Sequence, residues 1–288
     1  MTLMSALAGC ARPTSSPIGD RAAVVDQLDR LSQRIGGTPR QRTAGEVLQY
    51  HAYQDPIRDC MAKANFTYEP PRFTDPYRGR SVIHMGIGTG QWLAPLGEER
   101  IGVTDTAEIV GPQEDAGPSA NYRSLSQAEK DKFETALTGC IPRDTPEVNF
   151  PPAYYPLTEK FNQMLTAASK NEPVKAAGKQ YPDCMAKGNF KVDKHDDLIA
   201  LIQARIGSAQ PPKPNHAADA KWSSAVALER EAARLDTVCR KPAYDAALEA
   251  VAPAASEFER TEAAELTLVA QQWDDMEKRA AAYPEFPR

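Results

Sequence analysis

Hydrophobic positions recur at helical spacing in several long segments of the chain. In residues 20–35 they fall every three or four positions, at Val24, Val25, Leu28, Leu31 and Ile35. Residues 44–64 also have a helical pattern, which fits one helix or two helices that meet at Asp55-Pro56. Because such helices have one apolar face, we expect them to pack together around a core.

The second half of the chain continues this pattern. Ser126-Gln127-Ala128-Glu129 has the form of a capping box, which starts a helix. Further helices are expected over 158–170, 172–187 and 195–206. Residues 217–282 contain twenty alanines and no glycine, so they predict two or three long helices with interruptions at Pro242 and Pro253. A stripe in the last of these helices should face the bundle, and it consists of Leu266, Val269, Trp273 and Met276.

Residues 66–124 break the helical pattern. Proline and glycine make up about a quarter of this segment, about twice their share elsewhere in the chain. Residues 81–93 are the one stretch in which we consider a short strand or β-hairpin. The expected fold class is therefore mainly α, a helical bundle with a long irregular excursion rich in proline and glycine.

Two short sequences in the chain are nearly identical. Residues 59–66 read DCMAKANF and residues 183–190 read DCMAKGNF, which agree at seven of eight positions. Such a match indicates an internal duplication. The Cys-Met-Ala-Lys part favours helix, and Asn65 or Gly188-Asn189 can take the left-handed conformation that ends a helix. The phenylalanine that follows, Phe66 or Phe190, can then fold back onto the last turn.

The cysteines of the repeat lead to a prediction of disulfide bonds. Cys60, Cys140, Cys184 and Cys239 allow three pairings. We prefer Cys60–Cys140 with Cys184–Cys239, because duplication tends to copy a bridge within its unit, and Cys140 and Cys239 each close a helix-forming stretch. Disulfides require an oxidising compartment. The alternative is four buried free thiols in a cytosolic helical protein.

The duplication also suggests how the chain is organised. We expect a lipoprotein signal and tether over 1–19, a first helical unit over 20–156 that contains the loop 66–124, and a second helical unit over 157–288.

The first residues resemble the lipid-attachment signal of bacterial lipoproteins. Leu7-Ala8-Gly9 precedes Cys10 as an apolar residue and two small ones, and the polar, Pro/Ser-rich residues 11–17 suit a flexible tether. A signal peptide also needs a charged region and a longer apolar stretch, so an upstream start is expected. The alternative is a chance cysteine in a disordered N-terminus. Because no run of 18 apolar residues occurs, attachment to the membrane is expected through lipid on Cys10.

The amino-acid composition and net charge favour some classes of protein over others. The 288 residues include 39 acidic and 34 basic side chains, and 41% are hydrophobic. This is the composition of a globular protein, and its mildly acidic balance does not favour nucleic-acid binding.

Candidate chemistry is sparse. Residues 86–90 read GIGTG, but they lack the third glycine of a dinucleotide fingerprint and the Lys-Ser/Thr of a P-loop, so a flexible loop is favoured over a phosphate site. The histidines are His51, His84, His195 and His216. His195 precedes Asp196 and Asp197, but acidic residues are common where a helix begins. We therefore expect no metal, no cofactor and no catalytic residue.

The 66–124 loop is the expected place for a binding site. It contains many of the aromatic residues of the chain, with arginines between them, and our candidate binding residues are Arg78, Arg80, His84 and Trp92. If these side chains bind a partner, alanine at Arg80 and Trp92 should leave stability nearly unchanged. The alternative is that the aromatic side chains pin the loop to the bundle.

Two motifs resemble those of a group of uncharacterised exported lipoproteins of actinobacteria. That group has a CM-x3-G-F element, which matches here at Cys60 and Cys184 with Asn65 and Asn189 in place of glycine. A second element with glutamate, alanine, aspartate and cysteine matches, with approximate spacing, at Glu231, Ala233, Asp236 and Cys239. The resemblance implies export and helices, and it implies no activity.

Together these features predict a lipid-anchored cell-envelope protein that works by binding or as a scaffold. Its partner would be another envelope protein or a cell-wall glycan. The alternative is a cell-envelope hydrolase with its site in the 66–124 loop.

Overall fold

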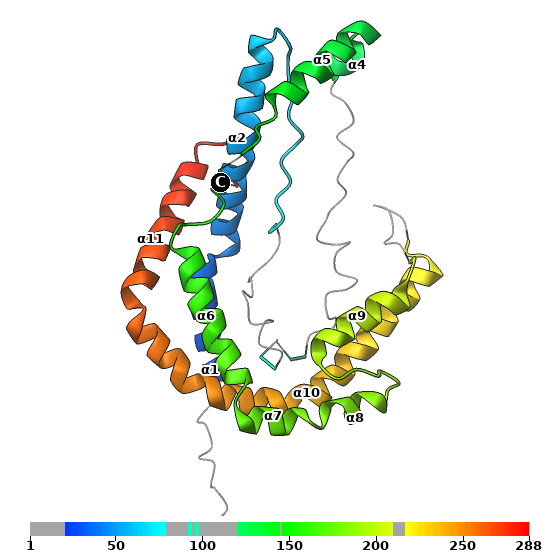
Figure 1. Ribbon diagram of the computed structural model, residues 1–288, viewed down its shortest axis with the longest axis vertical. Coiled ribbons are helices and arrows are strands. Elements are labelled where there is room, and N and C mark those ends of the chain that lie inside the picture. Colours follow the sequence, from blue (N-terminus) through cyan, green and yellow to red (C-terminus); the bar gives the residue numbers. More distant parts are fainter. Residues whose placement is uncertain are drawn as a thin grey trace, which may run out of the picture.

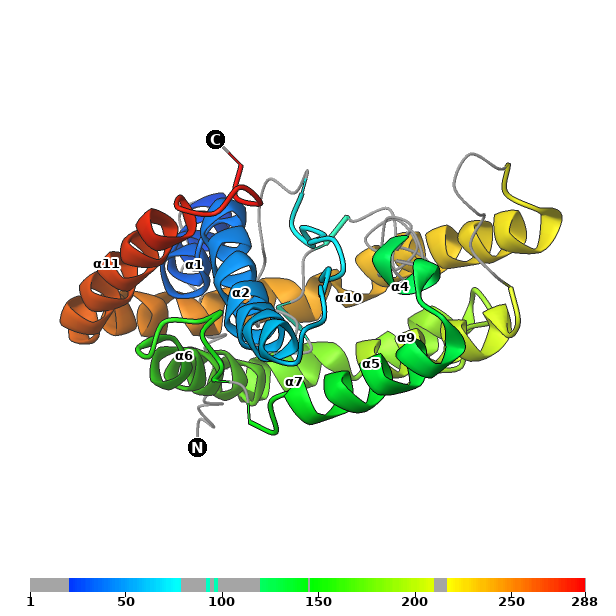
Figure 2. The ribbon, with the colours of Figure 1, turned by 90° about the horizontal axis from the view of Figure 1, so that it is seen from above.

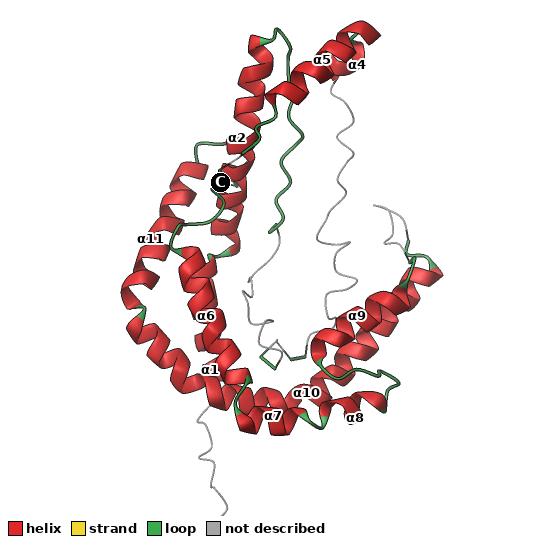
Figure 3. Cartoon of the chain, viewed as in Figure 1, coloured by secondary structure: helices red, strands yellow, loops and turns green. Residues whose placement is uncertain are grey.

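The computed structural model describes residues 21–78, 92–93, 96–97, 120–144, 146–209 and 217–287. These residues form helices and loops, and no strand occurs among them (Figure 3). The mainly α fold class is thereby confirmed. Most of the 81–93 stretch, including the GIGTG sequence, lies outside the described residues, as do Cys10 and the expected tether.

The helices form an open arch (Figure 1). One arm contains α1 (Arg21–Gly36), α2 (Pro39–Lys63), α6 (Tyr154–Ser169) and α11 (Ala263–Ala280). The other arm and the base contain α7 (Glu172–Gly178), α8 (Tyr181–Ala186), α9 (His195–Ile206) and the long α10 (Ala220–Thr261). The short α4 (Ala120–Ser124) and α5 (Gln127–Cys140) lie at the far end of α2.

Helix α10 connects the two arms. It has 42 residues, with Pro242 and Pro253 in its interior, and it packs against α1, α6, α7, α8, α9 and α11. Seen from above, α1, α2 and α11 gather at one end of α10, and α9 lies beside the other end (Figure 2). The expectation of two or three long helices over 217–282 is confirmed by α10 and α11. Contrary to that expectation, neither proline ends a helix, because tertiary packing on several sides holds α10 together.

Helix α2 starts earlier than its hydrophobic pattern indicates. The Gln41 N–H donates to Thr38 Oγ1 (3.2 Å), and the Thr38 N–H donates to Gln41 Oε1 (2.9 Å). This reciprocal pair is a capping box, and Pro39 in the first turn lacks the N–H that would have no partner there. The helix then continues through Pro56, so residues 44–64 belong to one helix and not to two.

The segment 172–187, expected as one helix, is divided into α7 and α8. Pro182 stands in the first turn of α8, where its missing N–H is harmless. Gly178 ends α7 beneath the indole of Trp92, and a Cβ built there would lie 2.5 Å from Trp92 Cζ2. The expected starts of α5 at its capping box and of α9 at His195 are confirmed.

Two apolar clusters hold the helices together. The larger one takes side chains from α1, α2 and all helices from α6 to α11, so it draws on both sides of position 156. Both predicted stripes belong to it, including Leu28, Ile35 and Trp273. The smaller one consists of Ile57, Met61 and Phe133 and joins α2 to α5. The division of the chain into two units at 156 stays a prediction.

The Trp273 side chain connects the last helix to the first. Its indole N–H donates to the Ile35 carbonyl (2.9 Å). Gly37, directly beyond α1, has a φ of +79°, and a Cβ at this position would lie 2.8 Å from Trp273 Cε2. Glycine is therefore required at position 37 both by its backbone conformation and by the close indole ring.

Within the ranges that the structure describes, no helix is both long and apolar enough to cross a membrane.

Candidate functional site

The four paired cysteines form the two predicted disulfides. Cys60 is bonded to Cys140 and Cys184 to Cys239, with Cα–Cα distances of 5.6 and 5.5 Å. The preferred pairing is thereby confirmed. One detail differs: Cys140 ends α5 as expected, but Cys239 lies in the interior of α10, which continues to Thr261.

The duplicated sequences also end their helices in the same way. Asn65 and Asn189 both have a φ of 63°, in the left-handed region. The Phe66 N–H donates to the Met61 carbonyl (2.9 Å), and the Phe190 N–H donates to the Met185 carbonyl (3.2 Å). These six-to-one hydrogen bonds, together with the bonds from the two asparagine N–H groups, define a Schellman motif in each copy.

A buried polar cluster lies beside the second copy, around the Asp236 carboxylate of α10. Tyr181 donates its hydroxyl to Asp236 Oδ1 (2.7 Å), and His195 Nδ1 lies 3.0 Å from the same oxygen. Arg240 Nε donates to Asp236 Oδ2 (2.9 Å). Since a carboxylate only accepts, the proton between His195 and Asp236 belongs to His195 Nδ1. The cluster connects the starts of α8 and α9 to one turn of α10.

These contacts change the proton affinities of two members of the cluster. Burial raises the pKa of the Asp236 carboxyl, but the hydrogen bonds from His195 and Tyr181 and the charges of Arg240 and His195 together lower it by more. The net pKa of Asp236 is therefore below its usual value, and the group is ionised at neutral pH. Burial, together with the Asp236 charge, raises the pKa of the Tyr181 hydroxyl, which consequently stays a hydrogen-bond donor.

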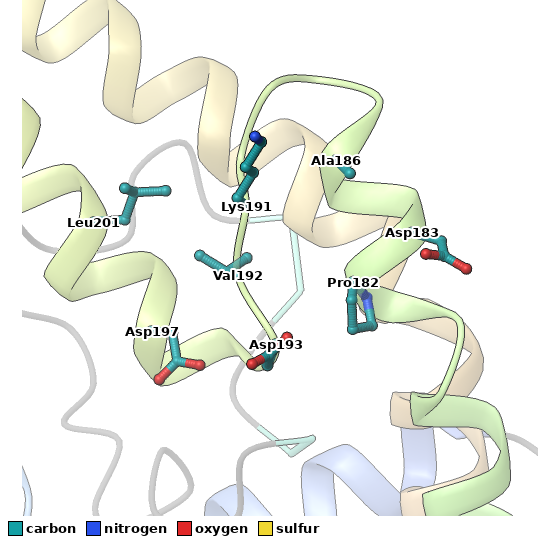
Figure 4. Close-up of a pocket in the computed structure, with 8 residues that line it drawn as sticks. All are labelled: Pro182, Asp183, Ala186, Lys191, Val192, Asp193, Asp197 and Leu201. Atoms are coloured by element: carbon teal, nitrogen blue, oxygen red, sulfur yellow. The ribbon is translucent and has the colours of Figure 1, made fainter.

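A pocket lies between α8 and α9, next to this cluster (Figure 4). Its volume is about 570 Å³, and three carboxylates and one ammonium group stand around apolar side chains in its wall. Its lining residues are Pro182, Asp183, Ala186, Lys191, Val192, Asp193, Asp197 and Leu201. Figure 4 shows Asp193 and Asp197 near each other on one side, with Asp183 on α8 across from them. Carboxylates accept hydrogen bonds from hydroxyl and amine groups, so this wall suits a polar ligand.

The two walls of the pocket are fixed to the same part of α10. The Cys184–Cys239 disulfide attaches α8, and the bond from His195 to Asp236 attaches the first residue of α9. Asp236 and Cys239 are one helical turn apart, so their side chains lie on the same face of α10. A disulfide and a hydrogen bond therefore hold both walls of the pocket in place, which favours a preformed binding site.

The candidate residues of the 66–124 loop are not brought together at this pocket. Arg80 and His84 lie outside the described residues, and Arg78 is exposed. Trp92 is 9% exposed, and its ring packs edge-on against Tyr181 with 5.8 Å between the centroids. The Trp92 side chain is therefore part of the core and fixes the loop to α7 and α8, in agreement with the alternative that aromatic side chains pin the loop to the bundle.

The described beginning of the loop also packs on the bundle. Tyr68 donates its hydroxyl to Gln54 Oε1 (2.9 Å), and Phe73 packs edge-on against Tyr50. Thr43 donates to Asp75 Oδ1 (2.8 Å). For residues 66–78, the structure agrees with the interpretation in which aromatic side chains pin the loop.

The two histidines that the structure describes contact carboxylates. His195 bonds to Asp236, and His51 contacts Asp55 and Glu285. In the described part of the chain, no three His, Cys, Asp or Glu side chains are placed to hold a metal ion. His84 and His216 lie outside that part.

Sequence patterns gave a weak signal for the Asp236 cluster. Asp236 and Arg240 are both 2% exposed, and they occupy the same helix face as Ala232, Ala233 and Ala243. A charged pair at positions four apart within a stripe of alanines indicates a buried ion pair. Its partners Tyr181 and His195 come from distant segments and could not be found by spacing.

Comparisons of the chain with protein-family models, curated proteins and solved structures found no match.

Proposed function

We propose that this chain is a lipid-anchored protein of the cell envelope that works by binding a partner or as a scaffold. The observation that carries the proposal is the pair of disulfides, Cys60–Cys140 and Cys184–Cys239. Such bonds form and persist in oxidising compartments outside the cytoplasm. The sequence Leu7-Ala8-Gly9-Cys10 supports attachment by lipid, since the thiol of Cys10 stands where lipoproteins carry a diacylglycerol.

The pocket between α8 and α9 is the place where we expect binding. Its walls are held to α10 by a disulfide and by a buried hydrogen bond, so little conformational entropy would be lost on binding. Carboxylates at Asp183, Asp193 and Asp197 offer acceptors to the hydroxyl and amino groups of a cell-wall glycan or to a basic side chain of an envelope protein. This proposal replaces the 66–124 loop as the expected site, because the described aromatic residues of that loop pack inward.

Lipid attachment is tested by growing the host organism with an alkyne analogue of palmitate. The protein, expressed from its own locus, should take up the label and partition into detergent. The Cys10→Ser variant should do neither. Incorporation of label by both forms, or by neither, would contradict the anchor and leave the binding proposal to its own test.

Binding is tested with purified, insoluble cell-wall material. The protein should sediment with it, and the double variant Asp193→Asn/Asp197→Asn should sediment about tenfold less. Asp144→Asn is a matched control, because this carboxylate is exposed and lies far from the pocket in sequence. If the pocket variant and the control sediment like the unaltered protein, the pocket does not bind the glycan.

A further inference from the structure

The C-terminal residues 281–287 are attached to α2 at two places. At the first, the guanidinium of Arg40 lies 4.4 Å from the centroid of the Phe286 ring, and Arg40 Nη1 donates to the Pro287 carbonyl (2.9 Å). Phe286 is 4% exposed and belongs to the large apolar cluster. This contact joins the Arg40 guanidinium to an aromatic ring and a backbone carbonyl, and none of these groups titrates near neutral pH.

The second attachment is the imidazole of His51. Its Nδ1 lies 3.2 Å from Asp55 Oδ1, and its Nε2 lies 3.0 Å from Glu285 Oε2. The ring of Tyr283 stacks on it, with 3.8 Å between centroids and 17° between planes. His51 is 9% exposed, so water has little access to replace these partners.

The doubly protonated form of the ring satisfies both of these contacts. A neutral imidazole has one N–H donor and one nitrogen with a lone pair, whereas the imidazolium ion donates from both nitrogens. Both nitrogens of His51 face carboxylate oxygens, which only accept. In the neutral form one of these contacts becomes a repulsion between a lone pair and an anion. Stacking on Tyr283 also favours the cation.

The other charged and titratable groups around His51 do not replace its contacts with Asp55 and Glu285. On α2, Arg58 pairs with Asp55, and Tyr50 packs edge-on against the imidazole. Burial and the Glu285 charge raise the pKa of the Tyr50 hydroxyl, so it stays neutral. From α11, Glu277 pairs with Arg40 and not with His51. Of the contacts between the C-terminal residues and α2, the one between Glu285 and His51 is thus the one that depends on a proton near neutral pH.

We propose that residues 281–287 form a pH-dependent strap, which is clamped to α2 when His51 is protonated and loosened when His51 is neutral. The ring that carries both protons donates to both carboxylates, so the clamp is complete in that form. It weakens when one of the two N–H donors is lost. Loosening would expose the Tyr283 ring and the face of His51 that it covers. An extracytoplasmic protein meets such changes of pH directly.

The test compares hydrogen–deuterium exchange of the strap amides at pH 5.5 and pH 8.0. Three forms of the whole protein are measured: unaltered, His51→Gln and Glu285→Gln. At pH 5.5 the strap should be about tenfold less protected in either variant than in the unaltered protein, because a charge-assisted hydrogen bond is lost. At pH 8.0 the three forms should agree. Comparison at one pH removes the intrinsic pH dependence of exchange.

Two controls separate the clamp from general loosening. Arg40→Gln removes a contact without a titrating group, so it should reduce protection equally at both pH values. Glu285→Gln changes only the strap, so it keeps the test valid if His51→Gln unfolds α2. Equal strap protection in the unaltered protein and Glu285→Gln at pH 5.5 would overturn the proposal, as would a difference of the same size at pH 8.0.

Discussion

Asn65 and Asn189 have the same left-handed backbone conformation, each with a φ of 63°, and each precedes a phenylalanine whose N–H closes the helix. Asparagine tolerates this conformation better than other residues with a Cβ, though less well than glycine. The duplicated sequence thus preserves a duplicated backbone motif, together with the disulfide that follows from its cysteine.

This relationship predicts the effect of substitution at the two caps. Alanine at Asn65 or Asn189 should lower the free energy of unfolding by about 1 kcal/mol, since alanine is strained at positive φ. Glycine at the same positions should be neutral or stabilising by a few tenths of a kcal/mol. Urea unfolding of the four single variants measures both effects. An alanine variant as stable as its glycine counterpart would show that the cap is not strained.

Removal of the two disulfides should loosen different helices. Loss of either bridge should lower global stability by about 4 kcal/mol, from the loop entropy of the unfolded chain. Replacing Cys184 and Cys239 by serine also frees α8 from α10. Replacing Cys60 and Cys140 frees α5, which contributes one buried side chain, Phe133, to the small cluster. Hydrogen exchange in the second variant should increase in α5 well before the rest of the protein unfolds. Uniform loss of protection in both variants would contradict this difference.

Trp92→Ala should be strongly destabilising. The indole is 9% exposed and covers Gly178, and large-to-small substitutions of buried aromatic residues cost about 3–5 kcal/mol. This reverses the expectation that follows if Trp92 belongs to an exposed binding surface. Arg78→Ala, an exposed position in the same loop, should change stability by about 0.5 kcal/mol or less. Thermal unfolding of both variants decides the matter, and a small effect at Trp92 would restore the binding interpretation.

Ionisation of Asp236 should make the free energy of unfolding depend on pH in the acidic range. Because the folded state lowers the pKa of Asp236, the ionised carboxylate contributes stability above the pKa of the unfolded state, and this contribution is lost as the pH falls below about 4. In Asp236→Asn, this part of the acid sensitivity should be absent. Tyr181→Phe should cost about 1–2 kcal/mol, since it removes a buried hydrogen bond to a charged group. Unfolding by urea at pH 3 to 7 measures all three forms, and parallel curves for the unaltered protein and Asp236→Asn would refute the assignment.

Local sequence patterns determined much of this fold. The spacing of hydrophobic residues placed α1, α9 and α11, a capping box placed the start of α5, and the repeated octapeptide gave both helix ends and the disulfide pairing. Each of these features depends on residues within a few turns of one another, or on a repeat that copies such a neighbourhood. Their energies are therefore visible in short stretches of sequence.

Tertiary structure decided the rest. Pro56, Pro242 and Pro253 remain inside helices because packing outweighs the lost hydrogen bonds, whereas the segment 172–187 is divided where Trp92 covers Gly178. The bond between His195 and Asp236, and that between His51 and Glu285, join segments far apart in the chain. No local pattern records such a contact, because its free energy comes from burial and charge pairing that exist only once the helices have packed.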